Sequence, residues 1–126
     1  MQRSYMKELE MNYDEIRVWG IHTKDDNLFL HNDVIAIGWK NIGDLSKIDV
    51  SRDAFRAKYE NTYPDVKKGS IATGADMLYR FIHEVQIGDY IVYPSKIDRQ
   101  INIGMVEGEY TYVDNATEYV QQRKVK

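Results

Sequence analysis

The hydrophobic and polar positions of the chain indicate two strands before residue 50. Residues 16–22 alternate between apolar and polar side chains, which is typical of a half-buried strand. Residues 34–39 form a continuous run rich in β-branched side chains and predict a strand that is buried on both faces. The polar residues 23–27 between them predict a turn.

A helical period replaces this pattern after residue 50. Ser51 predicts an N-cap, and Phe55, Tyr59 and Tyr63 lie four residues apart on one helix face. This helix is expected to end at Tyr63, because a residue that precedes a proline avoids the α region. Residues 70–83 predict a second helix with a clearer apolar stripe.

Three further strands are predicted at residues 90–93, 100–106 and 110–113. Strands that are separated from helices in this way favour an α+β fold. We expect a mainly antiparallel sheet that curls into a small barrel flanked by helices.

The same pattern sets the expected domain boundaries. We assign one recognition domain to residues 16–113. Residues 1–15 are interpreted as a tail or short helix, because only Met6, Leu9 and Tyr13 lie at helical spacing. Residues 114–126 are interpreted as a C-terminal segment that leads toward a separate effector domain.

The composition fits one globular domain without a membrane segment. The chain has 126 residues, of which 43% are hydrophobic and only 8 are Gly and 2 Pro, which excludes collagen-like and wholly disordered classes. Its longest clean aliphatic run has four residues, whereas a spanning helix needs about 20. The N-terminus has no apolar signal segment. The absence of cysteine excludes disulfides and thiolate metal sites, and it fits a cytoplasmic protein.

The charge balance argues against a general nucleic-acid binder. The chain carries 17 basic and 20 acidic residues, a net charge of -3. Proteins that bind nucleic acid irrespective of sequence usually present a strongly basic face. Any such contact must therefore come from a local patch. The basic residues at 123–126 are interpreted as a solvated run.

The common catalytic patterns are absent from the sequence. The three histidines are scattered, and no Gly-x-Ser-x-Gly turn is present, so we predict neither a zinc site nor a serine nucleophile. A metal nuclease needs Pro-Asp followed by an acid-x-Lys on a later strand. The chain has Pro64-Asp65, but the only lysine with an acid two residues earlier is Lys67, which reuses Asp65. We predict a non-catalytic domain without a metal or cofactor.

Two tryptophans are the strongest candidates for a binding site. Trp19 precedes Gly20, and Trp39 follows Gly38, each pair at the end of a predicted strand. A glycine at such a place lets a flat group approach the backbone closely. The two indoles are therefore interpreted as walls of a slot for a planar ligand such as a nucleobase. The alternative is that both tryptophans are ordinary core residues.

An ordered set of segments resembles a known family. The segments lie at residues 19–22, 35–39, 42–46, 75–81, 87–94 and 101–110. They are similar to the N-terminal domain of Mrr-type restriction endonucleases and related bacterial defence proteins, within the wider PUA-like group that includes EVE and YTH domains. The resemblance covers about residues 16–113.

The resemblance implies a curved β-barrel that takes a modified base into an aromatic pocket. Mrr-type proteins act on methylated foreign DNA, with cleavage in a separate nuclease domain. Trp19, Gly38 and Trp39 are carried over from the resemblance. Further residues are added by proximity and type: Gly20, His22, Asp44 and Ser95 for the base, Tyr93 for a wall, and Lys40, Lys96 and Arg99 for phosphates.

The expected partner is DNA with a modified base, flipped out of its stack at a cost of a few kcal/mol. The low charge would suit a module whose affinity is supplemented by other domains or by homo-oligomerisation. Two alternatives stay open: a sensor of a free nucleotide or signalling molecule, and a plain protein-interaction module.

Overall fold

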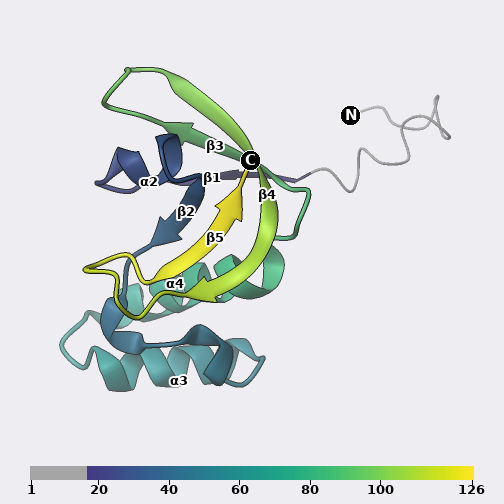
Figure 1. Cartoon of the computed structure of the whole chain (residues 1–126). Coiled ribbons are helices and arrows are strands. Elements are labelled where there is room, and N and C mark those ends of the chain that lie inside the picture. Colours follow the sequence, from purple (N-terminus) through teal and green to yellow (C-terminus); the bar gives the residue numbers. More distant parts are fainter. Residues whose placement is uncertain (1–16) are drawn as a thin grey trace, which may run out of the picture.

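Five strands form one strongly curved sheet in the computed structural model, which describes residues 17–126 (Figure 1). The strands are β1 (Val18–Gly20), β2 (Val34–Ile37), β3 (Tyr90–Pro94), β4 (Ile101–Tyr112) and β5 (Gln121–Val125), in the order β1-β3-β4-β5-β2. Only β1 and β3 pair in parallel. The predicted α+β fold with a mainly antiparallel sheet is confirmed.

The sheet is open rather than closed into a barrel. Its two edge strands, β1 and β2, are the shortest of the five. Each pairs with one neighbour within the described part of the chain, β1 with β3 and β2 with β5. The sheet is thus strongly curved, as expected, but the expected small barrel is not confirmed, because the two edge strands do not pair with each other. The tail expected at residues 1–15 lies outside the described residues.

The helical segments are α2 (Asp26–Leu30), the 3-10 turns η3 (Lys40–Ile42) and η4 (Leu45–Lys47), α3 (Arg52–Thr62), α4 (Lys68–Tyr79) and the π-helical turn η5 (Arg80–Glu84). Most helical segments lie at one end of the sheet, whereas α2 lies apart from α3 and α4, near β1, β2 and β3 (Figure 1). Both predicted helices are confirmed as α3 and α4–η5. Ser51 caps α3 as expected, since its hydroxyl accepts from the Ala54 amide at 3.0 Å.

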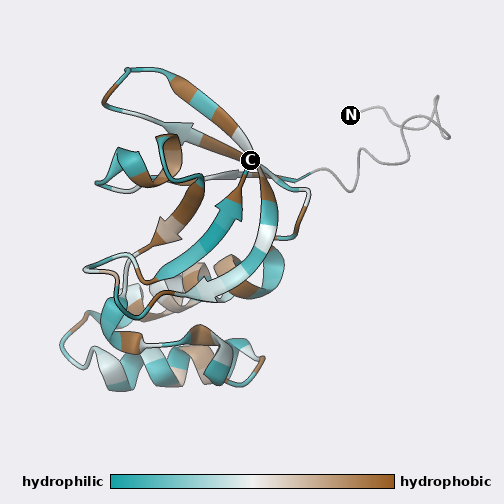
Figure 2. Ribbon diagram, in the orientation of Figure 1, coloured by the Kyte–Doolittle hydropathy of each residue, from teal (hydrophilic) through white to brown (hydrophobic). Residues whose placement is uncertain are grey.

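The core has two clusters, one in the curve of the sheet and one between the helices. The first includes Ile35, Phe81, Ile91 and Val106, and Trp19 packs at its border. The second joins α3 and α4 through residues such as Phe55 and Leu78. Figure 2 shows hydrophobic residues on α3 and α4 where the two helices face each other. The α4–η5 segment contributes to both clusters and thereby fixes the helices to the sheet.

Two elements differ from the sequence predictions. The turn expected at residues 23–27 runs into α2, because the Asp25 carboxylate accepts from the Asn27 amide at 3.0 Å and starts a helix. The strands expected at 100–106 and 110–113 are one strand, β4, with a bulge between Val106 and Tyr110.

The C-terminal segment belongs to the domain. Residues 121–125 form β5, which lies between β4 and β2. The boundary expected at residue 113 is therefore wrong. The basic run at 123–126 is solvated only in part, because Lys124 and Lys126 are exposed whereas the Arg123 side chain is buried.

Arg123 connects the sheet to the end of the α4–η5 segment. Its guanidinium donates to the carbonyls of Phe81, Val85 and Gly108. Burial of the guanidinium lowers the pKa of Arg123. A planar cation with five donors satisfies several carbonyls at a helix end, which explains why a charged residue stands inside this fold.

Candidate functional site

A cleft of about 410 Å³ lies where the two edges of the sheet face each other. We call it the Trp19 cleft. One side is formed by Trp19 of β1 and Ile91 of β3, and the other by Ile35 and Ile37 of β2. Met77, Arg80 and Phe81 from the α4–η5 segment close the end. The open sheet therefore creates this cleft, which a closed barrel would eliminate.

The Trp19 indole is held at the cleft by polar contacts. Its Nε1 donates to Oδ2 of Asp89 at 2.8 Å, and the same carboxylate oxygen accepts from the Gln86 amide at 2.9 Å. The Arg17 guanidinium stands over the ring, 6.0 Å from its centroid. Trp19 is half-buried, so the ring is fixed without being removed from solvent.

Trp39 lines a second hollow of about 350 Å³, which we call the Trp39 compartment. Its Nε1 donates to the Tyr59 hydroxyl at 2.9 Å. Its backbone has φ 63°, the left-handed region, which is costly for a bulky side chain. Lys24, Glu118 and Tyr119 line the same compartment.

The two tryptophans do not line one slot. The Trp19 cleft and the Trp39 compartment share His22, Ile37 and Met77 but not their indoles. The arrangement is two adjoining hollows with an exposed methionine between them. Both indoles are half-buried, and each packs against one core cluster while it lines a hollow.

His22 and Arg80 supply polar groups beside the apolar walls. The exposed His22 ring stacks on Tyr93 with a centroid distance of 5.8 Å and an interplanar angle of 23°. The Arg80 Nε lies 3.7 Å from the Glu84 carboxylate on the solvent side of the helical segment. Gly20 and Gly38 line the hollows with backbone, and a Cβ at either would meet nothing within 4 Å. A bound group could therefore reach the backbone at both positions.

Tyr93 and Ser95, expected near the base, belong to a buried network instead. The Tyr93 hydroxyl donates to Oδ1 of Asp26 at 2.7 Å, and the Ser95 hydroxyl lies 3.3 Å from Oδ2 of the same residue. The amides of Lys96 and Ile97 also donate to Asp26. The Tyr93 hydroxyl lowers the pKa of Asp26, and the amide donors lower it further. These groups hold the β3–β4 hairpin on α2, so the assignment of Tyr93 and Ser95 to a ligand is corrected.

The remaining candidate cations line neither of the two hollows. Lys96 and Arg99 are exposed in the loop that joins β3 and β4, and neither lines the two hollows. The Lys40 ammonium donates to the Thr117 carbonyl at 2.9 Å. These three cations therefore do not form one phosphate-binding cluster with the cleft.

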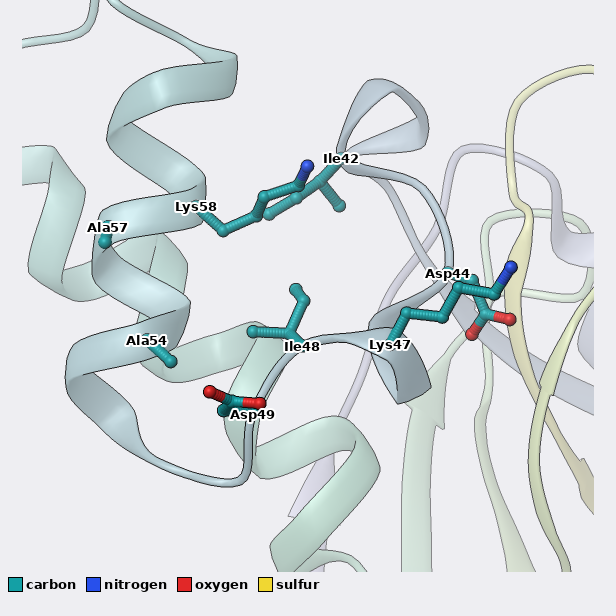
Figure 3. Close-up of a pocket in the computed structure, with 8 residues that line it drawn as sticks. All are labelled: Ile42, Asp44, Lys47, Ile48, Asp49, Ala54, Ala57 and Lys58. Carbon is teal, nitrogen blue, oxygen red and sulfur yellow. The ribbon is translucent and has the colours of Figure 1, made fainter.

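Asp44 lies in a different pocket, between the η3–η4 segment and α3 (Figure 3). Its carboxylate accepts from the amide and hydroxyl of Ser46 and caps η4. The pocket has about 500 Å³ and shares no lining residue with the Trp19 cleft or the Trp39 compartment. Asp44 is thus a local cap rather than a reader of the same ligand.

Several lining residues were not expected from the sequence. Arg80 and Phe81 lie three and four residues after Met77, at helical spacing, but the sequence pattern assigns a role only to the buried stripe of that helix. The exposed Met77 and Arg80 at the edge of that stripe are the signal that could have identified a helix bordering a cleft. Ile35 and Ile37 were assigned to the core alone.

Two other features are absent from residues 17–126, the part of the chain that the structure describes. No group of three or more His, Asp or Glu side chains there is placed to hold a metal ion. No helix in this part of the chain is long and apolar enough to cross a membrane.

Residues 21–126 match the model of a family described as a domain of unknown function, DUF8426. No curated protein and no solved structure matches the chain.

Proposed function

The chain belongs to the DUF8426 family, and we propose that it is a non-catalytic recognition domain that binds a base of nucleic acid in the Trp19 cleft. The open, strongly curved sheet with helices at one end supports a PUA-like, EVE-like domain of this kind. The substrate class is DNA with a methylated base flipped out of its stack. In this role the domain acts in the cytoplasm as the specificity module of an attached nuclease or other effector.

The observation that carries this proposal is the geometry of the Trp19 cleft. Its volume of about 410 Å³ lies within the usual range of small-ligand sites, about 300–1,000 Å³. An indole fixed by Asp89 stands opposite the isoleucines of β2. Stacking of a base on such a ring is worth about 1–3 kcal/mol, which offsets the cost of unstacking that base.

The apolar walls favour a methylated base over an unmodified one. Ile35, Ile37, Phe81 and Ile91 offer no hydrogen bond to an added substituent. Burying one methyl group contributes about 0.8 kcal/mol, or roughly a fourfold gain in affinity. A hydroxymethyl group would have to leave its hydroxyl unpaired against the same walls, which disfavours it.

The Trp39 compartment is suited to the neighbouring nucleotide. It adjoins the Trp19 cleft at Met77, and Lys24 stands at its border. A flipped base in the cleft would bring the next base of the strand toward Trp39 and a phosphate toward Lys24. The ligand then is a strand with at least two nucleotides.

The low positive charge supports a second candidate, a free nucleotide. Among residues 17–126, Lys24 and Arg80 are the lysine and arginine side chains that line the two hollows. A single DNA strand held by two phosphate contacts would have a shallow salt dependence, with a slope of about 1.4. A free nucleotide with one phosphate contact would have a still shallower dependence, with a slope of about 0.7.

The experiment is a fluorescence anisotropy titration with labelled single-stranded oligonucleotides of one sequence. One carries a methylated base, one a hydroxymethylated base and one no modification, and each is measured at three salt concentrations. We expect the methylated strand to bind best, and its affinity to fall when the neighbouring nucleotide is made abasic. Affinity for the free methylated nucleotide equal to that for the methylated strand, with no greater salt dependence for the strand, would establish the second candidate. No binding of any nucleic acid or nucleotide would overturn both and favour a protein-interaction module.

A further inference from the structure

The outer face of β1, β3 and β4 carries a continuous set of apolar residues. Side chains alternate between the two faces of a strand, and paired positions in register share a face. Trp19 and Ile91 are paired and point to the inner face with the cleft, so Val18 and Tyr90 point outward. We call the outward set the outer patch. Its members are Val18, Tyr90, Val92, Pro94, Ile101, Ile103 and Met105.

The outer patch contains the most exposed large apolar side chains of its sheet. Ile101 is 70% exposed and Ile103 69%. The turns at the two ends of β3 add the exposed residues Ile87 and Ile97. In the described chain, only Val50 and Met77 are large apolar residues with comparable exposure elsewhere. Figure 2 shows hydrophobic bands along the upper half of β4.

The outer patch combines exposed apolar side chains with an absence of charge. No charged residue belongs to the outer patch, and charged side chains resume on β4 only at Glu107 and Glu109. Contiguous exposed apolar patches of a few hundred Å² commonly mark an interaction site. A polar partner would bury hydrogen-bonding groups against this face without a partner for them, which is unfavourable.

We propose that the outer patch is the interface of a symmetric homodimer. A two-fold axis places the same surface on both subunits, so an uncharged apolar face meets an uncharged apolar face without a second complementary sequence. Homodimer interfaces are also the more apolar class, at about 65% non-polar area.

The area agrees with a weak but specific dimer. A fully exposed aliphatic side chain presents roughly 100 Å², so the outer patch and the two flanking isoleucines present on the order of 400 Å². If this apolar area makes up about 65% of the interface, each subunit buries roughly 600 Å², and the two subunits together bury about 1,200 Å². That total is the lower limit of stable protein interfaces, so the dimer dissociates on dilution.

The dimer leaves the Trp19 cleft open. Trp19 and Ile91 lie on the inner face of the strands whose outer face would be covered. The two subunits would then present two clefts on opposite sides of one assembly. The proposal stands independently of the proposed ligand.

The test is sedimentation velocity of the full chain from about 1 μM to about 1 mM, a range that covers weak dimers. We expect the mass to rise from 14.8 kDa toward twice that value. Ile103→Asp should weaken the dimer at least tenfold. Val50→Asp is the matched control, because Val50 is as exposed as Ile101 but lies outside the sheet. It should leave the dissociation constant unchanged.

Two results would overturn the proposal. A protein that remains monomeric at every concentration would exclude the homodimer. A dimer that Ile103→Asp leaves intact would show that the interface lies elsewhere. Circular dichroism of both variants verifies that each is folded.

Discussion

Two aromatic residues on adjoining strands each bind a buried aspartate, yet their surroundings differ. The Trp19 Nε1 donates to Asp89 at 2.8 Å, and the Tyr93 hydroxyl donates to Asp26 at 2.7 Å. Trp19 remains half-buried and lines a cleft, whereas Tyr93 is 1% exposed and lies between Phe29 and His22. The carboxylate orients both rings, and only the space beside the ring decides whether a ligand can use it.

The comparison also distinguishes the two networks chemically. Asp26 accepts from four groups of the chain, which ties the β3–β4 hairpin to α2. Asp89 accepts from Trp19 and one amide and leaves the indole ring beside the cleft. We therefore expect substitutions at Tyr93 to affect stability and substitutions at Trp19 to affect binding.

The largest expected effect is the loss of binding in Trp19→Ala. Removal of a stacking ring worth about 1–3 kcal/mol weakens binding by roughly 5- to 150-fold. Anisotropy titration with the methylated oligonucleotide measures this change. Trp19→Phe retains a planar ring but not the hydrogen bond to Asp89. Its affinity for the oligonucleotide should fall less than that of Trp19→Ala. Unchanged affinity in Trp19→Ala would contradict the assignment of the cleft.

Tyr93→Phe should give the opposite result, with reduced stability and unchanged binding. The variant removes the hydroxyl that bonds Asp26 and the Thr23 carbonyl, and buried groups without partners cost about 1–3 kcal/mol. Urea unfolding measures the free energy of unfolding, and the same titration measures affinity. A tenfold loss of affinity in the folded variant would show that Tyr93 belongs to the binding site.

Arg80→Gln is expected to have a moderate effect that depends on salt. If Arg80 contacts one phosphate, its removal lowers the slope of log affinity against log salt by about 1. Arg56→Gln is the matched control, because Arg56 lies on α3, pairs with Asp76 and lines neither hollow. Identical salt slopes for the two variants would exclude Arg80 from the contact with DNA.

The smallest expected effect concerns the acid stability of the Asp26 network. Hydrogen bonds hold the pKa of Asp26 below its usual value near 3.8. A carboxylate with a lowered folded-state pKa stabilises the fold above the pKa of the unfolded state, and this stabilisation is lost as pH falls through the folded-state pKa. Between about pH 5 and pH 2, the melting temperature of Asp26→Asn should therefore fall less than that of the parent protein. Parallel curves for the two proteins would contradict this assignment.

The hydrophobic pattern of the sequence predicted the elements whose burial is apolar. The α3 helix, the α4–η5 segment and β2 all have regular apolar stripes or runs, and the structure confirms them. The sequence Gln-Gln-Arg-Lys-Val of β5 has no such pattern, because Gln121 and Arg123 are buried through hydrogen bonds. A periodicity argument cannot detect a strand of this kind.

The candidate site was predicted in part. Trp19, Gly20, His22, Gly38 and Trp39 all line the two hollows, because local sequence placed them at the ends of strands. Tyr93 and Ser95 are residue types that often occur in binding sites, but here their hydroxyls are hydrogen-bonded to Asp26. Asp26 lies 67 residues from Tyr93 and 69 residues from Ser95 in the sequence. Such a partner is set by tertiary contacts and leaves no local signal.

The most direct measurement uses the indole N–H resonances in a ¹⁵N-correlated NMR spectrum. The chain has two tryptophans, so two indole signals are expected, and Trp39→Phe assigns them. Titration with the methylated oligonucleotide should shift the Trp19 signal strongly and the Trp39 signal less. If both indole signals stay in place while other resonances report binding, the ligand is bound outside the cleft and the central claim is contradicted.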